Sequence, residues 1–130
     1  MDSDKIKQLL ERLGRTLSAG DLRGVSSCFE LPAVFLSDDG ATILADTSQL
    51  EKVFAQASDW YRSRGLVSTK AELERVDRLS ERLAAVDVRW PAFDASGQEK
   101  SSERSHYILQ IGKDGQVRIR VALTRTLCPK

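Results

Sequence analysis

The sequence has few of the residues that build metal centres and disulfide frameworks, and no stretch that could span a membrane. It contains two cysteines, Cys28 and Cys128, and one histidine, His106, too few for a disulfide scaffold or a zinc site of thiolates or paired imidazoles. No run approaches the roughly 18 apolar residues of a membrane span. The opening residues, MDSDKIKQLL, are polar and acidic where a secretory signal is basic and then apolar. We therefore expect a cytoplasmic protein without a membrane contact, a metal or a cofactor.

An excess of charge of either sign is also missing. Lys and Arg total 20 and Asp and Glu total 19, giving a formal net charge of +1. Domains that bind nucleic acid usually carry a clear basic excess, so no nucleic-acid partner is expected. The hydrophobic fraction of 41% and the charged fraction of 30% are typical of soluble globular proteins. A chain of 130 residues is long enough for one core, and we expect a single domain over 1–130.

The first third of the chain predicts two helices and a β-hairpin. Residues 3–18 place five apolar side chains on one stripe at helical spacing: Ile6, Leu9, Leu10, Leu13 and Leu17. Ala-Gly-Asp at 19–21 ends this helix, and residues 21–30 predict a short second helix that Pro32 ends. Residues 33–36 and 41–45 then predict two short strands, joined by a Ser-Asp-Asp-Gly sequence that is typical of a tight turn.

The rest of the chain predicts one more helix and several strands. Thr47 or Ser48 begins the helix, Gly65 ends it, and its inward stripe is Leu50, Val53, Phe54, Ala57, Trp60 and Tyr61. Residues 70–84 fit an amphipathic helix, but they also fit a strand over about 67–77 that turns into a second strand over 82–93. A polar loop at 94–103 follows, and then strands at 105–111 and 116–126 form a hairpin.

This order of elements resembles the nuclear transport factor 2-like superfamily, which includes ketosteroid isomerases, SnoaL-like polyketide cyclases, limonene epoxide hydrolases and scytalone dehydratases. The resemblance is carried by AGDLRGVSSCF at 19–29, AVFLSDDG at 33–40 and the last hairpin, and it covers about residues 5–126. It implies an α+β cone, in which three N-terminal helices pack on the concave face of a curved antiparallel sheet. It also favours strands over a helix for residues 67–93, and it implies a homodimer joined through the outer surface of the sheet.

The catalytic set that the resemblance implies for a steroid isomerase is absent. Such an enzyme uses a carboxylate base together with a tyrosine and a protonated acid that stabilise an oxyanion. These roles fall on Ser37, Leu13 and Arg104 respectively, and all three are unfilled. The catalytic candidates that remain are Asp38, His106 and Tyr107, acting with a water molecule, although the Asp38-Asp39 pair is itself typical of a turn.

The last strand has two faces, and the kind of pocket that it lines depends on which face points inward. One face carries Arg118 and Arg120 together with Ala122 and Thr124, and the other carries Val117, Ile119, Val121 and Leu123. A gapless alignment with the family turns the arginine face towards the pocket, where it would select an anionic ligand. Burial of each large apolar side chain is worth about 1.5–3 kcal/mol. We therefore expect the valine face to point inward and the arginines to lie on the outer surface.

The expected function is that of a small-molecule binding module with an apolar pocket of unknown ligand. The predicted ligand contacts are Leu13, Leu17, Phe35, Trp60, Trp90 and Tyr107. Such a set suits a neutral aromatic or polycyclic ligand and offers no carboxylate or imidazole to a metal ion. The alternatives are a lyase, isomerase or hydrolase acting on a small polyketide-like or terpenoid-like substrate, and a protein-interaction domain. A closed, filled cone favours interaction, and an open cone with a buried carboxylate favours catalysis.

Overall fold

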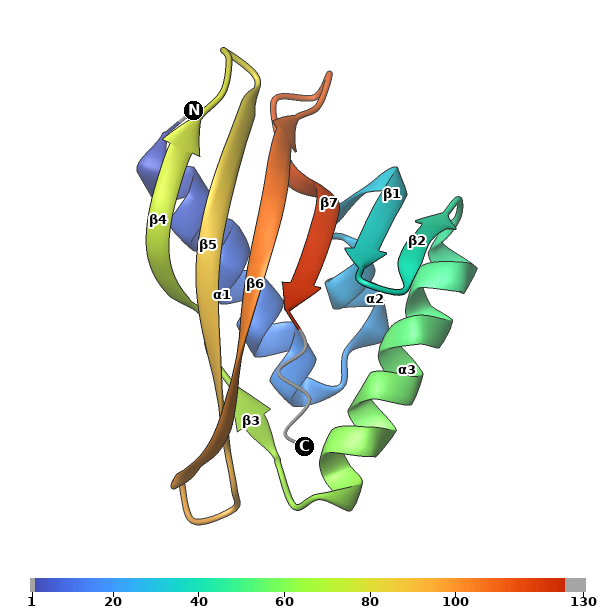
Figure 1. Ribbon diagram of the computed structural model, residues 1–130, viewed down its shortest axis with the longest axis vertical. Coiled ribbons are helices and arrows are strands. Elements are labelled where there is room, and N and C mark those ends of the chain that lie inside the picture. The colour runs from blue at the N-terminus through green and yellow to red at the C-terminus, as the bar shows by residue number, and fades with distance from the viewer. Residues whose placement is uncertain (1, 126–130) are drawn as a thin grey trace.

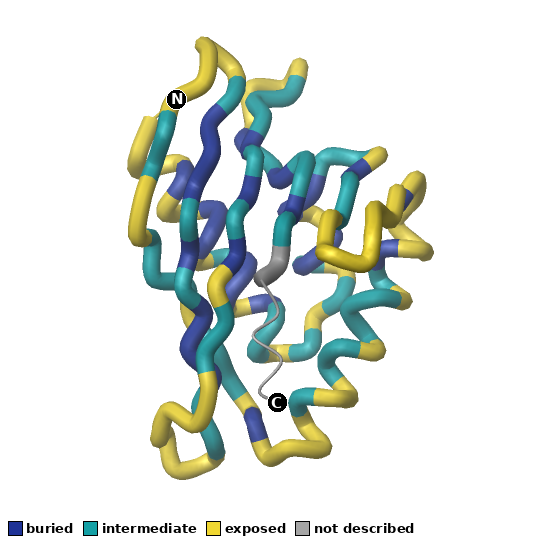
Figure 2. The backbone as a smooth tube through the Cα atoms, viewed as in Figure 1, coloured by how far each residue is buried: buried dark blue, intermediate teal, exposed yellow. Residues whose placement is uncertain are grey.

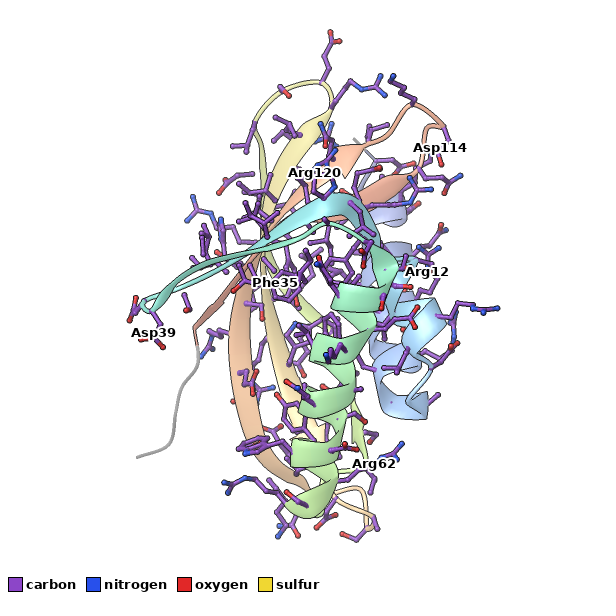
Figure 3. The ribbon with its side chains drawn as sticks, turned by 90° about the vertical axis from the view of Figure 1, so that its right-hand side faces the viewer. Arg12, Phe35, Asp39, Arg62, Asp114 and Arg120 are labelled. Carbon is purple, nitrogen blue, oxygen red and sulfur yellow. The ribbon has the colours of Figure 1, made fainter. Side chains whose placement is uncertain are left out.

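The computed structural model describes residues 2–125, which contain three helices and seven strands (Figure 1). A curved sheet forms one layer, and the helices lie together on its concave side (Figures 1 and 3). The predicted α+β cone is confirmed. The elements in chain order are α1 (Ser3–Ala19), α2 (Leu22–Ser26), β1 (Phe29–Ser37), β2 (Gly40–Leu44), α3 (Thr47–Ser63), β3 (Ser68–Thr69), β4 (Glu72–Arg78), β5 (Leu83–Phe93), β6 (Glu99–Ile111) and β7 (Val117–Arg125).

The sheet has the strand order β2-β1-β7-β6-β5-β3, and β4 also pairs with β5. Residues 67–93 therefore form strands, as the resemblance predicted. Within the described residues, every pairing is antiparallel except that of β1 with β7, which is parallel. The prediction of a fully antiparallel sheet is thus wrong for the pair of β1 and β7. Strands joined by a tight turn must run antiparallel, whereas most of the chain separates β1 from β7, so their relative direction is free of that constraint.

Acidic side chains cap the two long helices. Asp2 accepts from the Asp4 backbone N–H at the start of α1, and Asp46 accepts from the Gln49 N–H at the start of α3. The start predicted for α3, Thr47 or Ser48, lay one or two residues after this cap. At the other end of α1, Gly20 adopts a left-handed conformation with φ of 69°, which glycine tolerates and which ends the helix where predicted.

The second helix is shorter than predicted. It ends at Ser26, because Phe29 already pairs with Ile119 on β7 at the start of β1. Pro32 does not end the helix. It lies inside β1, where the register with β7 shifts between Phe29 and Val34, and such irregular positions are where strands accommodate proline.

The last strand contains a β-bulge that decides which side chains face the helices. Ile108 on β6 pairs with Val121 while Leu109 pairs with Ile119, so Arg120 is an extra residue on β7. Before the bulge, Val117 and Ile119 are buried inward, as predicted. After it the alternation reverses, because the extra residue shifts the register. Ala122 is buried inward, and the predicted inward position of Val121 and Leu123 is wrong.

The core lies between α1 and the middle of the sheet, where the backbone is most deeply buried (Figure 2). The helix contributes its predicted stripe, of which Ile6, Leu9, Leu10 and Leu13 are at most 3% exposed. From residue 2 to residue 125, no helix is both long and apolar enough to cross a membrane. The core therefore fixes α1 on the sheet, while α3 lies further out and leaves space beneath it.

Candidate functional site

A cavity of about 340 Å³ opens between the concave face of the sheet, α1 and α3. Five of the six predicted ligand contacts line it: Leu13, Leu17, Phe35, Trp90 and Tyr107. Small-molecule sites usually measure about 300–1,000 Å³ and are mainly apolar. The cavity is therefore large enough for a ligand of a few rings, and the periodicity of the sequence found five of its lining residues.

Trp60 is the predicted contact that the structure places elsewhere. It is 46% exposed and packs under the Arg64 guanidinium, 4.3 Å from the ring centroid. Tyr61 lines the cavity instead. The reason is helix geometry: Tyr61 lies about three turns after the buried Leu50 and repeats its direction, while Trp60 is rotated by about 100° from Tyr61.

Three phenylalanines form an aromatic wall on one side of the cavity. Phe29 and Phe35 come from β1 and Phe54 comes from α3, and their ring centroids are 5.6–6.0 Å apart. Figure 3 shows Phe35 between the sheet and α3. Rings at these separations in tilted arrangements attract one another and pack well, so this wall offers a flat ligand a preformed apolar surface.

The opposite wall is polar, and the sequence patterns did not predict it. β6 begins at Glu99, well before residue 105, and pairs with β5 over its whole length. Ser101, Glu103 and Ser105 therefore lie on the same inward face as Tyr107. Ser101 and Glu103 were assigned to a polar loop because an inward strand face without apolar residues looks like one, whereas Ser105 was predicted to begin a strand. The period of two that runs from Ser101 to Tyr107 is the signal that could have revealed them.

Glu103 and Tyr61 meet in this cavity from different layers of the fold. The Tyr61 hydroxyl on α3 donates to Glu103 Oε1 on β6. Burial raises the pKa of Tyr61 well above its ordinary value, and the Glu103 carboxylate raises it further. Tyr61 therefore stays protonated and acts as the donor of the pair.

Tyr107 and Trp90 form a second polar contact at the sheet surface. The Trp90 Nε1–H donates to the Tyr107 hydroxyl over 2.9 Å. Burial raises the pKa of Tyr107 to about 12, although hydrogen bonds with Ser105 and Trp90 act in the opposite direction. Both groups keep an apolar ring exposed to the cavity while their polar atoms satisfy each other.

Two of the three predicted catalytic candidates lie outside the cavity. Asp38 is exposed in the β1–β2 turn, and Figure 3 places its neighbour Asp39 at the far tip of that hairpin. The Asp-Asp sequence thus serves a turn, as the residue types indicated. His106 lies on the outer face of the sheet, where its Nδ1 is 2.6 Å from Asp87 Oδ1. Only Tyr107 among the three candidates reaches the cavity.

The three positions that the family resemblance assigned to steroid-isomerase roles also lie in different places. Leu13 lines the cavity, Ser37 is exposed at the end of β1, and Arg104 points outward to Glu74. The inward neighbour of Arg104 is Glu103. A one-residue difference on a strand reverses the face, so Glu103 faces the cavity while Arg104 does not.

The arginines of the last strand lie where they were expected, but the cavity contains a carboxylate that was not. Arg118 and Arg120 lie outside the cavity, where Arg118 donates to Glu30 and Asp114 and Arg120 donates to Gln110. Among the described residues that line the cavity, the charged ones are Glu103 and Arg62, so a lining without a carboxylate was a wrong expectation. Among all the residues that the structure describes, no three His, Cys, Asp or Glu side chains are grouped to hold a metal ion.

A curved sheet that encloses an apolar cavity with three helices defines a cone-shaped α+β protein. The chain belongs to the family described as NTF2-like protein (DUF6841), which matches residues 3–127. Among curated proteins none matches significantly.

Several solved structures share this fold at low identity. A domain of unknown function with a cystatin-like fold from Nostoc punctiforme is 21% identical, with a TM-score of 0.76 over 95% of this chain and 75% of that one. An NTF-2 like protein of unknown function from Shewanella oneidensis is 17% identical, with a TM-score of 0.71 over 95% and 98% of the two chains. A ketosteroid isomerase-like protein from Erwinia carotovora atroseptica is 13% identical, with a TM-score of 0.69 over 93% and 92%.

Proposed function

We propose that this protein binds a small aromatic or polycyclic molecule in the cavity between the sheet and α3. The observation that carries the proposal is the lining itself, in which three phenylalanine rings face Trp90 and Tyr107 across about 340 Å³. An apolar cavity with a few convergent polar groups is the usual form of a small-molecule site. The planar side chains on both walls favour a flat ligand.

The two tryptophans supply a direct test of binding in this cavity. Trp90 lines the cavity and Trp60 lies outside it, and the chain has two tryptophans in all. In a Trp60→Phe variant the indole emission therefore reports on Trp90 alone. A library of neutral bicyclic and tricyclic compounds, screened by thermal shift, is expected to yield ligands that quench or shift this emission. Ligands that stabilise the protein while leaving the Trp90 emission unchanged would place the site elsewhere.

An enzymatic function is a second candidate, because the open cavity contains the half-buried carboxylate of Glu103. A carboxylate in such a place can act as a general base or acid, which fits a lyase, isomerase or hydrolase on a polyketide-like or terpenoid-like substrate. The test is mass spectrometry of each ligand from the screen after incubation with the protein. Conversion by the native chain and its loss in Glu103→Gln would support catalysis, and unchanged ligands would leave a binding module.

We also propose that the protein forms a homodimer through the outer face of its sheet. Proteins with this fold often form dimers. The register places six apolar side chains next to one another across β2, β1, β7 and β6, and we call them the outer apolar patch: Val34, Leu36, Ile43, Ile108, Val121 and Leu123. Leu36 is 39% and Ile43 is 66% exposed. Ala122, expected on this face, points inward.

A further inference from the structure

We infer that the Glu103 carboxylate is the polar anchor of the cavity and that it selects ligands carrying a hydrogen-bond donor on a flat apolar ring. The inference rests on the proposed ligand-binding function and adds the chemical group that the ligand must carry. It concerns recognition, and it holds whether or not the bound molecule is converted.

The phenol groups of the cavity are already engaged with protein partners. The Tyr107 hydroxyl accepts from the Trp90 indole. The Tyr61 hydroxyl donates to Glu103. A ligand acceptor that took the Tyr61 hydrogen would break this bond, and an unpaired buried polar group is costly. Tyr61 is therefore a poor first contact for a ligand.

Glu103 retains acceptor capacity beyond its bond with Tyr61. A carboxylate offers about four acceptor sites on its two oxygens, and the Tyr61 hydroxyl occupies one of them at Oε1. Glu103 also pairs directly with Trp90 across β5 and β6, on the face that lines the cavity. A ring stacked beside the Trp90 indole would thus bring a donor on its edge to the remaining carboxylate sites.

The charge around Glu103 favours a donor over an acceptor. Among the salt bridges between side chains of residues 2–123, none includes Glu103. The other charged residue of the lining is Arg62 on α3, whose guanidinium reaches the C-terminal end of α1, since a Cβ on Gly20 would come within 2.7 Å of its Nη2. With no cation of the described side chains paired to the carboxylate, a ligand hydroxyl or ammonium is attracted, and a carbonyl or carboxylate facing it is repelled.

Three probes on one ring system test the inference: 2-naphthol donates a hydrogen bond, 2-methoxynaphthalene does not, and 2-acetylnaphthalene presents a carbonyl acceptor. Their dissociation constants are measured for the native chain, for Glu103→Gln and for Glu74→Gln, in which an outer-face carboxylate paired with Arg104 is changed. We expect 2-naphthol to bind the native chain and Glu74→Gln about tenfold more tightly than 2-methoxynaphthalene, as one hydrogen bond to a charged group allows. In Glu103→Gln this difference is expected to fall to about twofold or less.

Each other outcome has a definite meaning. Equal binding of 2-naphthol and 2-methoxynaphthalene to the native chain would refute the role of Glu103 and leave the apolar site intact. Tightest binding of 2-acetylnaphthalene would mean that the cavity recognises acceptors, which also overturns the inference. Failure of all three probes would refute the proposed function together with it.

Binding of 2-methoxynaphthalene shows whether Glu103→Gln keeps its fold. If Glu103→Gln has lost its fold, a second variant keeps the test informative. Tyr61→Phe removes the donor that competes for Glu103 and keeps the carboxylate. It is expected to bind 2-naphthol more tightly than the native chain does, with 2-methoxynaphthalene unchanged. Weaker binding of 2-naphthol to this variant would contradict the inference.

Discussion

At the scale of single residues, polar atoms on large aromatic rings determine how the cavity is built. Trp90 and Tyr107 satisfy each other through one hydrogen bond of 2.9 Å, and this contact lets two amphipathic side chains present apolar surface. Tyr61 does the same through Glu103. The largest side chains of the lining thus turn apolar surface to the cavity, and the Glu103 carboxylate keeps further acceptor sites.

The two tryptophans are expected to differ in their contribution to binding. Trp90→Ala removes a cavity wall and should weaken a ligand from the fluorescence screen by tenfold or more, since burying a large aromatic surface contributes about 1.5–3 kcal/mol. Trp60→Ala changes a half-exposed ring outside the cavity and should leave the affinity unchanged. Calorimetric titration measures both. An unchanged affinity in Trp90→Ala would show that the ligand binds elsewhere.

Tyr107 is expected to make the stability of the fold sensitive to alkaline pH. Burial raises the pKa of Tyr107 to about 12 from the ordinary tyrosine value of 10.0, so the unfolded chain releases this proton first. The stabilising contribution is therefore complete below about pH 10 and is lost between about pH 10 and 12, at roughly 1.4 kcal/mol per pH unit.

Urea denaturation at several alkaline pH values measures this contribution. Tyr107→Phe should lose less stability than the native chain between about pH 10 and 12, because its ring has no proton to release. At neutral pH the same variant should be less stable by about 1–3 kcal/mol, since the Trp90 indole N–H loses its acceptor. Identical alkaline slopes for the two chains would contradict the assignment.

At the scale of elements, the position of α3 decides the shape of the cavity. This helix supplies Val53, Phe54 and Tyr61 to the lining, and its start is held by Asp46 and Gln49. Asp46 accepts from the Gln49 N–H over 2.9 Å, and Gln49 Oε1 accepts from the Ala45 N–H over 2.7 Å. This reciprocal pair is close to a capping box, which satisfies backbone donors at a helix N-terminus.

Loss of this cap should destabilise the protein by a modest and specific amount. Asp46→Ala leaves the Gln49 N–H without its acceptor and is expected to cost about 1 kcal/mol in the free energy of unfolding. Asp46→Asn retains a good capping oxygen and should cost much less. Urea denaturation at neutral pH compares the two variants. Equal stabilities for the native chain and Asp46→Ala would mean that the cap does not hold α3.

At the scale of the whole molecule, the fold separates two apolar surfaces on opposite sides of one sheet. The concave side holds the cavity, and the convex side carries the outer apolar patch. The bulge at Arg120 shapes both surfaces, because it turns Ala122 inward and Val121 and Leu123 outward. A single extra residue thereby serves the cavity and the proposed dimer interface together.

The dimer is expected to depend on the outer apolar patch. Light scattering at high micromolar concentration should give a dimer for the native chain. Leu36→Glu should give a monomer, since a charge buried without a partner at an interface is costly. Leu79→Glu changes a side chain that is 54% exposed in the turn between β4 and β5 and should leave the dimer intact. A monomeric native chain at that concentration would end the proposal.

The sequence by itself determined the features that depend on neighbours along the chain. The stripe of α1 and the Ser-Asp-Asp-Gly turn were both predicted from residue order. These patterns are local, because helical and strand periods repeat within a few residues. They were sufficient to place five of six predicted side chains at the cavity.

Only the tertiary structure decided the features that depend on distant segments. The meeting of Tyr61 with Glu103 joins residues 42 positions apart, and neither residue signals the other in the sequence. The parallel pairing of β1 with β7 and the bulge at Arg120 arise in the same way, from the fit of strands that are distant in sequence. Register between such strands is set by how the whole core packs. The identity of the carboxylate in the cavity was therefore decided by packing, and the periods of the sequence could not supply it.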